Sequence, residues 1–169
     1  MTPLPRRVVI ASDHAGVEMK RRLREAMEAL GISAEDLGTG SGESVDYPDY
    51  AAAVAGRVSA GTAEAGVLIC GTGVGMSIAA NKVPGVRAAL LYDDDAARLS
   101  RLHNDANVAV FGARTMSADD AARRLRLFLS EPFEAGRHAR RIEKIRGIEK
   151  TIPAGAAPAA QRGAPMSYL

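Results

Sequence analysis

Short apolar segments alternate with longer amphipathic segments along the first 150 residues. Each apolar run has the length of a strand, and the segment after it repeats its apolar residues every three or four positions, which is typical of a helix. The predicted strands are RVVIAS (7–12), ISAEDL (32–37), GVLIC (66–70), VRAALLY (86–92) and NVAVFG (107–112). This order predicts parallel strands joined by right-handed crossovers, with helices on both faces. The expected fold class is therefore α/β, a doubly wound, five-stranded parallel sheet of the flavodoxin or Rossmann-like kind.

The helices of this pattern are marked by their ends as well as by their spacing. Gly31 closes the first helix, Pro48 opens the second, and Ser117 with Asp120 three residues later introduces the last crossover helix. The predicted helices cover residues 17–30, 48–60, 75–82 and 94–104, and a further segment that starts after Ser117.

A final helix is predicted from Gly136 to about Lys150. Its apolar stripe consists of Ile142, Ile145 and Ile148 and lies beside a basic stripe. Such a stripe packs either on the protein's own sheet or on a partner subunit. Beyond it, residues 151–169 are rich in Pro, Ala and Gly and have no apolar periodicity, so we expect a flexible tail attached to one folded domain of residues 1–150.

Composition narrows the class of protein. The chain has 169 residues, 47% of them apolar, and is large enough to bury a single core. A formal charge of +2 is too small to suggest a nucleic-acid partner. No apolar run is long enough to span a bilayer or to serve as a signal sequence, which argues against a membrane location. The single cysteine cannot form an internal disulfide, so a reducing compartment, the cytoplasm, is expected.

A glycine-rich loop, GTGVG, follows the third predicted strand. In open parallel sheets, ligands bind beyond the carboxyl ends of the strands, and backbone N–H groups of such a loop can hold an anion. A simple chain turn explains the glycines equally well. The loop is not a dinucleotide-binding motif, because Met76 occupies the position of the third glycine, and it lacks the lysine of a P-loop.

Cys70, the only cysteine, lies where this strand becomes the loop. A free cysteine is usually a small apolar core residue. The end of a strand that faces a helix N-terminus is also a place where a thiolate is stabilised and can act as a base or nucleophile. Both interpretations are consistent with the sequence of the strand.

The histidines and two arginines of the chain add further candidates. His14, His103 and His138 all lie in polar segments, and the neighbours of His138 indicate a solvated face. Arg137 and Arg141 are one helical turn apart, as expected either for an exposed basic face or for two groups that grip one phosphate. No cysteine and histidine spacing suits zinc, so no metal site is expected.

Five motifs together resemble one known family. SDHAG, DYPDYA, LICGTGVGMSIAANK, RLHNDANVAVFGAR and GRHARRIEKI occur in order. They resemble the type B ribose-5-phosphate isomerases, a family that also includes the galactose-6-phosphate isomerase subunits. The resemblance extends from about residue 7 to residue 150 and leaves out only the tail.

This resemblance implies aldose-ketose isomerisation of ribose 5-phosphate and ribulose 5-phosphate through a cis-enediol, without a metal or an organic cofactor. It implies that Cys70 is the base, because Met76 stands where some relatives carry a glutamate. It also implies that His103 opens the furanose ring. The implied catalytic residues are Cys70, His103, Thr72 and Asp13, and the implied substrate-binding residues are Asp13, His14, Gly71, Thr72, Gly73, Val74, Gly75, Asn104, Arg114, Arg137 and Arg141.

Family resemblance further implies a homodimer, or a dimer of dimers, with sites shared between subunits. Two other functions remain open from the sequence. One is the isomerisation of a six-carbon sugar phosphate, such as allose 6-phosphate or galactose 6-phosphate. The other is a non-catalytic anion-binding module that uses the glycine loop alone.

Overall fold

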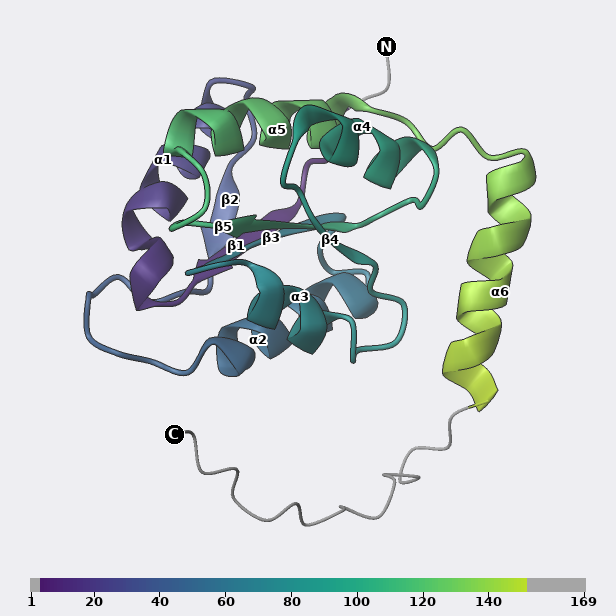
Figure 1. Cartoon of the computed structure of the whole chain (residues 1–169), viewed down its shortest axis with the longest axis horizontal. Helices are drawn as coiled ribbons and strands as arrows, with labels where there is room; N and C mark the ends of the chain where they lie inside the picture. Colours follow the sequence, from purple (N-terminus) through teal and green to yellow (C-terminus); the bar gives the residue numbers. More distant parts are fainter. Residues whose placement is uncertain (1–3, 152–169) are drawn as a thin grey trace, which may run out of the picture.

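The computed structural model describes residues 4–151, within which five parallel strands form one sheet (Figure 1). Its strand order is β2-β1-β3-β5-β4, and all four neighbouring pairs are parallel. The strands are β1 (Val8–Ser12), β2 (Ala34–Asp36), β3 (Ala65–Cys70), β4 (Ala88–Leu90) and β5 (Val108–Gly112). The predicted fold class is confirmed. Strands β2 and β4 are shorter than the apolar pattern predicts, because each lies at an edge and has a hydrogen-bonded neighbour on one side only.

Helices cover both faces of the sheet (Figure 1). One face carries α1 (Val17–Glu28), α4 (Asp94–Leu102) and α5 (Ala118–Ser130), and the other carries α2 (Tyr47–Ser59) and α3 (Val74–Ala80). A hydrophobic core lies on each face of the sheet, and alternate strand residues point into the two cores. Ile10 packs toward α1 and α5, whereas Val9 packs toward α2. Each fully buried aliphatic side chain of this size contributes about 1.5–3 kcal/mol to stability.

Local signals in the sequence determine several helix ends. The Ser117 hydroxyl accepts a hydrogen bond from the N–H of Asp120 and caps α5, as predicted. Asp93 caps α4 in the same way, through the N–H of Ala96. A short 3₁₀ turn, η1 (His14–Gly16), was not predicted and leads from β1 into α1. No helix within residues 4–151 is both long enough and apolar enough to cross a membrane.

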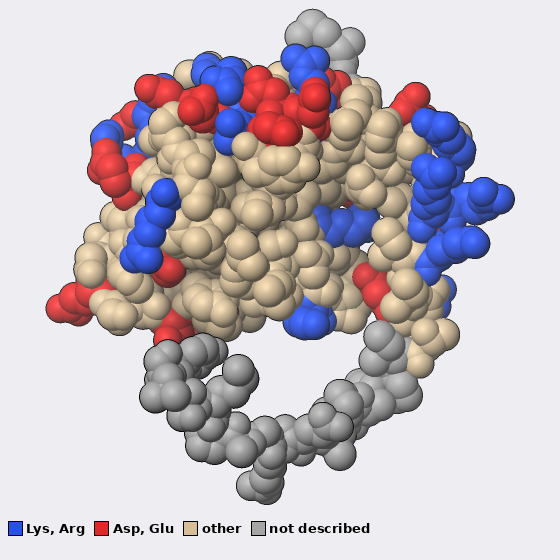
Figure 2. Space-filling view, in the orientation of Figure 1, with Lys and Arg blue, Asp and Glu red and all other residues tan. Residues whose placement is uncertain are grey.

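The final helix, α6 (Arg137–Thr151), stands apart from the two layers (Figure 1). Ile142 is buried, but Ile145 and Ile148 are 38% and 57% exposed. They line a groove of about 1030 Å³ between α6 and the start of β4, seen as a hollow in Figure 2. The predicted apolar stripe is therefore only partly covered by the protein's own chain. The predicted tail lies almost entirely outside the described residues, so its flexibility and the 1–150 domain boundary stay predictions.

Candidate active site

The carboxyl ends of β1, β3 and β5 lie side by side and bring three of the predicted site segments together. In the parallel register, Ser12 is opposite Ile69, and Cys70 is opposite Gly112. The N–H of Asp13 donates to the carbonyl of Ile69 over 3.1 Å, and the N–H of Arg114 donates to the carbonyl of Gly71 over 2.8 Å. The segments that follow the three strands are thus fixed to one another by backbone hydrogen bonds.

Cys70 lies at the centre of this carboxyl edge. Its side chain is 5% exposed, and its Sγ atom accepts a hydrogen bond from the N–H of Gly73 over 3.2 Å. Gly73 has a φ of 79°, and a Cβ atom there would lie 2.4 Å from Leu90 Cδ1 and 3.1 Å from the backbone of Phe111. Only glycine allows this turn, because both the backbone conformation and the surrounding space exclude a side chain. The glycine loop therefore folds back against the thiol.

Two larger side chains lie over the same loop. A Cβ atom at Gly71 would be 3.3 Å from the guanidinium of Arg114, and one at Gly75 would be 2.6 Å from the ring of Tyr47. Arg114 is a predicted site residue and is placed here, against Gly71. Tyr47 was not predicted as a site residue. It opens α2 and lies in DYPDYA, which the sequence indicated only as one of the family motifs.

Asp13 and His14 complete the carboxyl edge. Asp13 is buried, and its Oδ1 atom accepts a hydrogen bond from the N–H of Ala15 over 2.9 Å. The Nδ1 atom of His14 accepts a hydrogen bond from the N–H of Val45 over 3.2 Å. In its neutral form His14 therefore carries its proton on Nε2, which makes that atom a hydrogen-bond donor.

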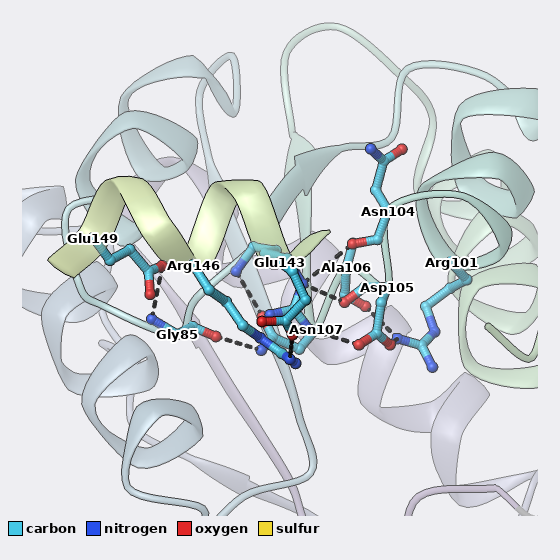
Figure 3. Close-up of polar contacts among 10 residues, drawn as sticks. Gly85, Arg101, Asn104, Asp105, Ala106, Asn107, Glu143, Arg146 and Glu149 are labelled. Atoms are coloured by element: carbon cyan, nitrogen blue, oxygen red, sulfur yellow. Dashed lines mark hydrogen bonds and ion pairs between the residues drawn. The ribbon is translucent and has the colours of Figure 1, made fainter. Parts of the chain in front are cut away.

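His103 and Asn104 lie at the opposite, amino edge of the sheet. Helix α4 leaves β4 at the carboxyl edge and runs back, so that it ends beside the start of the strands. The carbonyl of Asn104 accepts a hydrogen bond from Nε of Arg87, the residue before β4, over 3.2 Å. Figure 3 shows Asn104 and Asp105 in this network. The six residues of β3 separate the two edges by about 16 Å, so a single chain does not bring His103 and Asn104 to Cys70.

His103 belongs to a second cluster at the amino edge. Its ring stacks on the ring of His138, with centroids 4.2 Å apart and planes 5° apart. The Oε2 atom of Glu134 lies 3.5 Å from Nε2 of His103 and 3.6 Å from Nε2 of His138. The backbone N–H of Glu134 donates to the carbonyl of Leu102, which joins the loop before α6 to the end of α4.

His138 is buried, and this burial lowers its pKa. The interpretation of His138 as part of a solvated face was wrong, since its side chain is 4% exposed. Burial lowers its pKa from the ordinary value, and repulsion from His103 and Arg137 lowers it further, against the opposing effect of Glu134. The Nε2 atom of His138 accepts a hydrogen bond from Nε of Arg137 over 3.3 Å. Arg137 and Arg141 are both exposed at the start of α6.

Comparison with known proteins identifies the family. The sequence profile of the family described as Ribose/Galactose Isomerase matches residues 8–145. The chain belongs to this family. It is 41% identical to ribose-5-phosphate isomerase B of Escherichia coli over 145 residues, which cover 86% of this chain and 97% of that protein.

Solved structures of ribose/galactose isomerase family members have the same fold. The type B ribose 5-phosphate isomerase of Trypanosoma cruzi matches with a TM-score of 0.85 and 47% identity, over 87% of this chain and all of that one. A ribose 5-phosphate isomerase of Thermotoga maritima matches with a TM-score of 0.81 and 50% identity, over 83% of this chain and 97% of that one. The resemblance to type B ribose-5-phosphate isomerases is confirmed.

The family's sequence motifs indicated most residues of the two edges, but not Glu134, which contacts His103 and His138. Glu134 had no signal, because it lies in a loop and belongs to no motif. Its neighbour Ala135 has a φ of 58°, and Gly136 has a φ of 53°. These two left-handed residues turn the chain between α5 and α6 and direct Glu134 toward the histidines. Hydrophobic periodicity does not reveal such a turn.

Proposed function

We propose that the protein interconverts ribose 5-phosphate and ribulose 5-phosphate through a cis-enediol intermediate, with Cys70 as the base. The observation that carries this proposal is the position of Cys70. Its sulfur lies at the carboxyl edge and accepts the N–H of Gly73, inside a loop of backbone donors. Family membership and the names of the relatives support the substrate.

Proton transfer between two carbons is the chemistry of this proposal. The Cys70 thiolate removes the proton from C2 of the open-chain aldose, which leaves an enediolate with its charge on O1. The hydroxyl proton of O2 then passes to O1, and the thiol returns the first proton to C1, so that C2 becomes the carbonyl carbon of the ketose. The N–H groups of Gly73 and Val74 already donate to Cys70 Sγ and Thr72 Oγ1. The remaining backbone N–H groups of the loop from Gly71 to Gly75, beside Thr72, stabilise the oxygen on which negative charge develops. Each such donor typically contributes about 3 kcal/mol to transition-state stabilisation. No electron is transferred, so the reaction requires no redox cofactor.

Residues at both edges of the sheet bind the phosphate and the hydroxyl groups of the sugar. His14 donates from Nε2, and the Arg114 guanidinium lies over Gly71 at the same edge as the base. Asp13 lies beside them and binds a sugar hydroxyl. Arg137 and Arg141 are exposed at the other edge and suit a phosphate dianion. His103 acts as the acid and base that opens the ring, and Asn104 binds a hydroxyl next to it.

A complete site therefore combines two chains. The length of the strands, about 16 Å for β3, separates the two edges of the sheet. A sugar phosphate held at Cys70 therefore cannot reach His103 of the same chain. We propose that the carboxyl edge of one protomer meets the amino edge of its partner in a homodimer, or in a dimer of dimers. Exposed apolar side chains support such an interface: Val74, Ile78 and Tyr92 are 49%, 58% and 68% exposed. A thiol base must stay reduced, and we place the enzyme in the cytoplasm for that reason.

One alternative substrate class has specific support. The family description includes galactose as well as ribose, and a six-carbon sugar phosphate would use the same base and loop. A coupled assay with ribose 5-phosphate, allose 6-phosphate and galactose 6-phosphate distinguishes the two. We expect the highest kcat/KM with ribose 5-phosphate and no turnover of any of the three by Cys70→Ala protein. A higher kcat/KM with a six-carbon substrate would reassign the substrate, and no turnover by the unsubstituted protein would refute an isomerase.

A further inference from the structure

Glu134, His103 and His138 place three metal-ligating atoms at one point of the amino edge. The Oε2 atom of Glu134 lies 3.5 Å from one histidine Nε2 and 3.6 Å from the other. All three ligand atoms lie within 4.8 Å of one another. Glu134 and His138 have no part in the reaction proposed above, so their arrangement needs a separate explanation.

The geometry of the cluster is close to that of a zinc site. Two imidazoles and one carboxylate form a ligand set known from zinc enzymes, in which the fourth tetrahedral position is left open. With metal bonds of about 2.0–2.1 Å, tetrahedral ligand atoms lie ~3.4 Å apart. Both distances from Glu134 are near this value, so only the two imidazole nitrogens have to approach each other.

One side-chain rotation completes the site. The two rings are stacked, whereas a shared ion must lie near the plane of each ring. His138 is 4% exposed and fixed by packing, but the His103 side chain is 34% exposed at the end of α4. Its χ2 torsion is soft, so the ring can turn its Nε2 toward the ion without a change of the backbone. His138 already presents a lone pair, which accepts the 3.3 Å hydrogen bond from Arg137.

We propose that His103, Glu134 and His138 bind a divalent transition-metal cation of the Zn²⁺ type, and that this ion inhibits the enzyme. The ion occupies the Nε2 atom of His103 and displaces Arg137 from His138. Inhibition rests on the proposed function, in which His103 opens the sugar ring and Arg137 binds phosphate. Binding of the ion does not depend on that function.

Metal binding is measured first, by titration of tag-free protein with Zn²⁺ in competition with a chromophoric chelator. We expect one ion per chain, and affinity at least about tenfold weaker in Glu134→Gln and His138→Gln. The matched control is Glu143→Gln, since Glu143 is an exposed glutamate on α6 that pairs with Arg146. It should bind Zn²⁺ like the unsubstituted protein. In the isomerase assay, saturating Zn²⁺ should lower turnover, EDTA should restore it, and Glu134→Gln should resist inhibition.

Three outcomes separate the possibilities. If Zn²⁺ affinity in Glu134→Gln and His138→Gln stays within about twofold of the unsubstituted protein, the site does not exist. Binding that survives in both variants but disappears in Cys70→Ser would place the ion on the thiol and also overturn the proposal. If the ion binds as expected while no sugar phosphate is isomerised, the metal site stands and the proposed function fails.

Discussion

The backbone N–H of Gly73 points at the sulfur of Cys70, 3.2 Å away, so the glycine loop and the only thiol of the chain form one unit. The loop can approach the thiol because Gly73 adopts a left-handed conformation against Leu90 and Phe111. A buried cysteine that merely fills space would not require this geometry.

Replacement of Cys70 by alanine should abolish isomerisation and leave the fold intact. Loss of a proton-transfer group lowers kcat by about 10²-fold or more. Stability should fall by only about 1 kcal/mol, because a single sulfur atom leaves the core. Turnover measured with ribose 5-phosphate and thermal unfolding of the same sample check both parts. An enzyme that keeps turnover within about tenfold of the unsubstituted protein would have its base elsewhere.

Replacement of Gly73 by alanine should destabilise the protein by more than about 2 kcal/mol, since the new Cβ atom meets both a strained φ and a crowded site. Gly61→Ala is the matched control. Gly61 has a φ of 71° but nothing within 4 Å of its Cβ position, so only the conformational cost of about 1–2 kcal/mol applies. Urea unfolding of the two variants measures the difference. Equal losses would mean that the contacts with Leu90 and Phe111 relax freely.

His103→Asn should separate ring opening from proton transfer. We expect turnover of ribose 5-phosphate to fall by about 10²-fold. Exchange of the transferred proton with solvent, followed from open-chain ribulose 5-phosphate, should fall much less, because that ketose needs no ring opening. A parallel collapse of exchange and turnover would assign His103 to the enediol step instead.

The lowered pKa of His138 should make stability depend on pH. The unfolded chain binds a proton as pH falls through about 6.5, whereas the folded protein, with its lower pKa, resists protonation. Stability from neutral His138 is therefore present above about pH 6.5 and is lost as pH falls through that value toward the folded pKa. Thermal unfolding from pH 7 to pH 5 should show a shallower decline for His138→Gln. Identical slopes would show that other groups cause the dependence.

Much of the fold, and the residues that the structure gathers at the carboxyl edge, could be predicted from the sequence. The apolar run from Val8 to Ser12, which is buried at every position, and the helical spacing after each strand reflect local geometry. The end of the third strand indicated Cys70, and the family motifs indicated Asp13 and Arg114. The strand order and the contact of Tyr47 with Gly75 depend on tertiary packing, which a single sequence does not display. The burial of His138 depends on the left-handed turn at Ala135, where neither composition nor periodicity gives a signal.

Subunit complementation tests the central claim most directly, namely that Cys70 of one protomer works with His103 of its partner. Cys70→Ala and His103→Ala proteins are each inactive by this account. When they are mixed in equal amounts and allowed to exchange subunits, each hybrid dimer contains one intact site and one doubly defective site. Random exchange makes half of the dimers hybrids, so roughly a quarter of the unsubstituted activity should return. Mass spectrometry verifies that the subunits have exchanged. If activity does not return in a sample whose exchange has been verified, the site is not shared between chains.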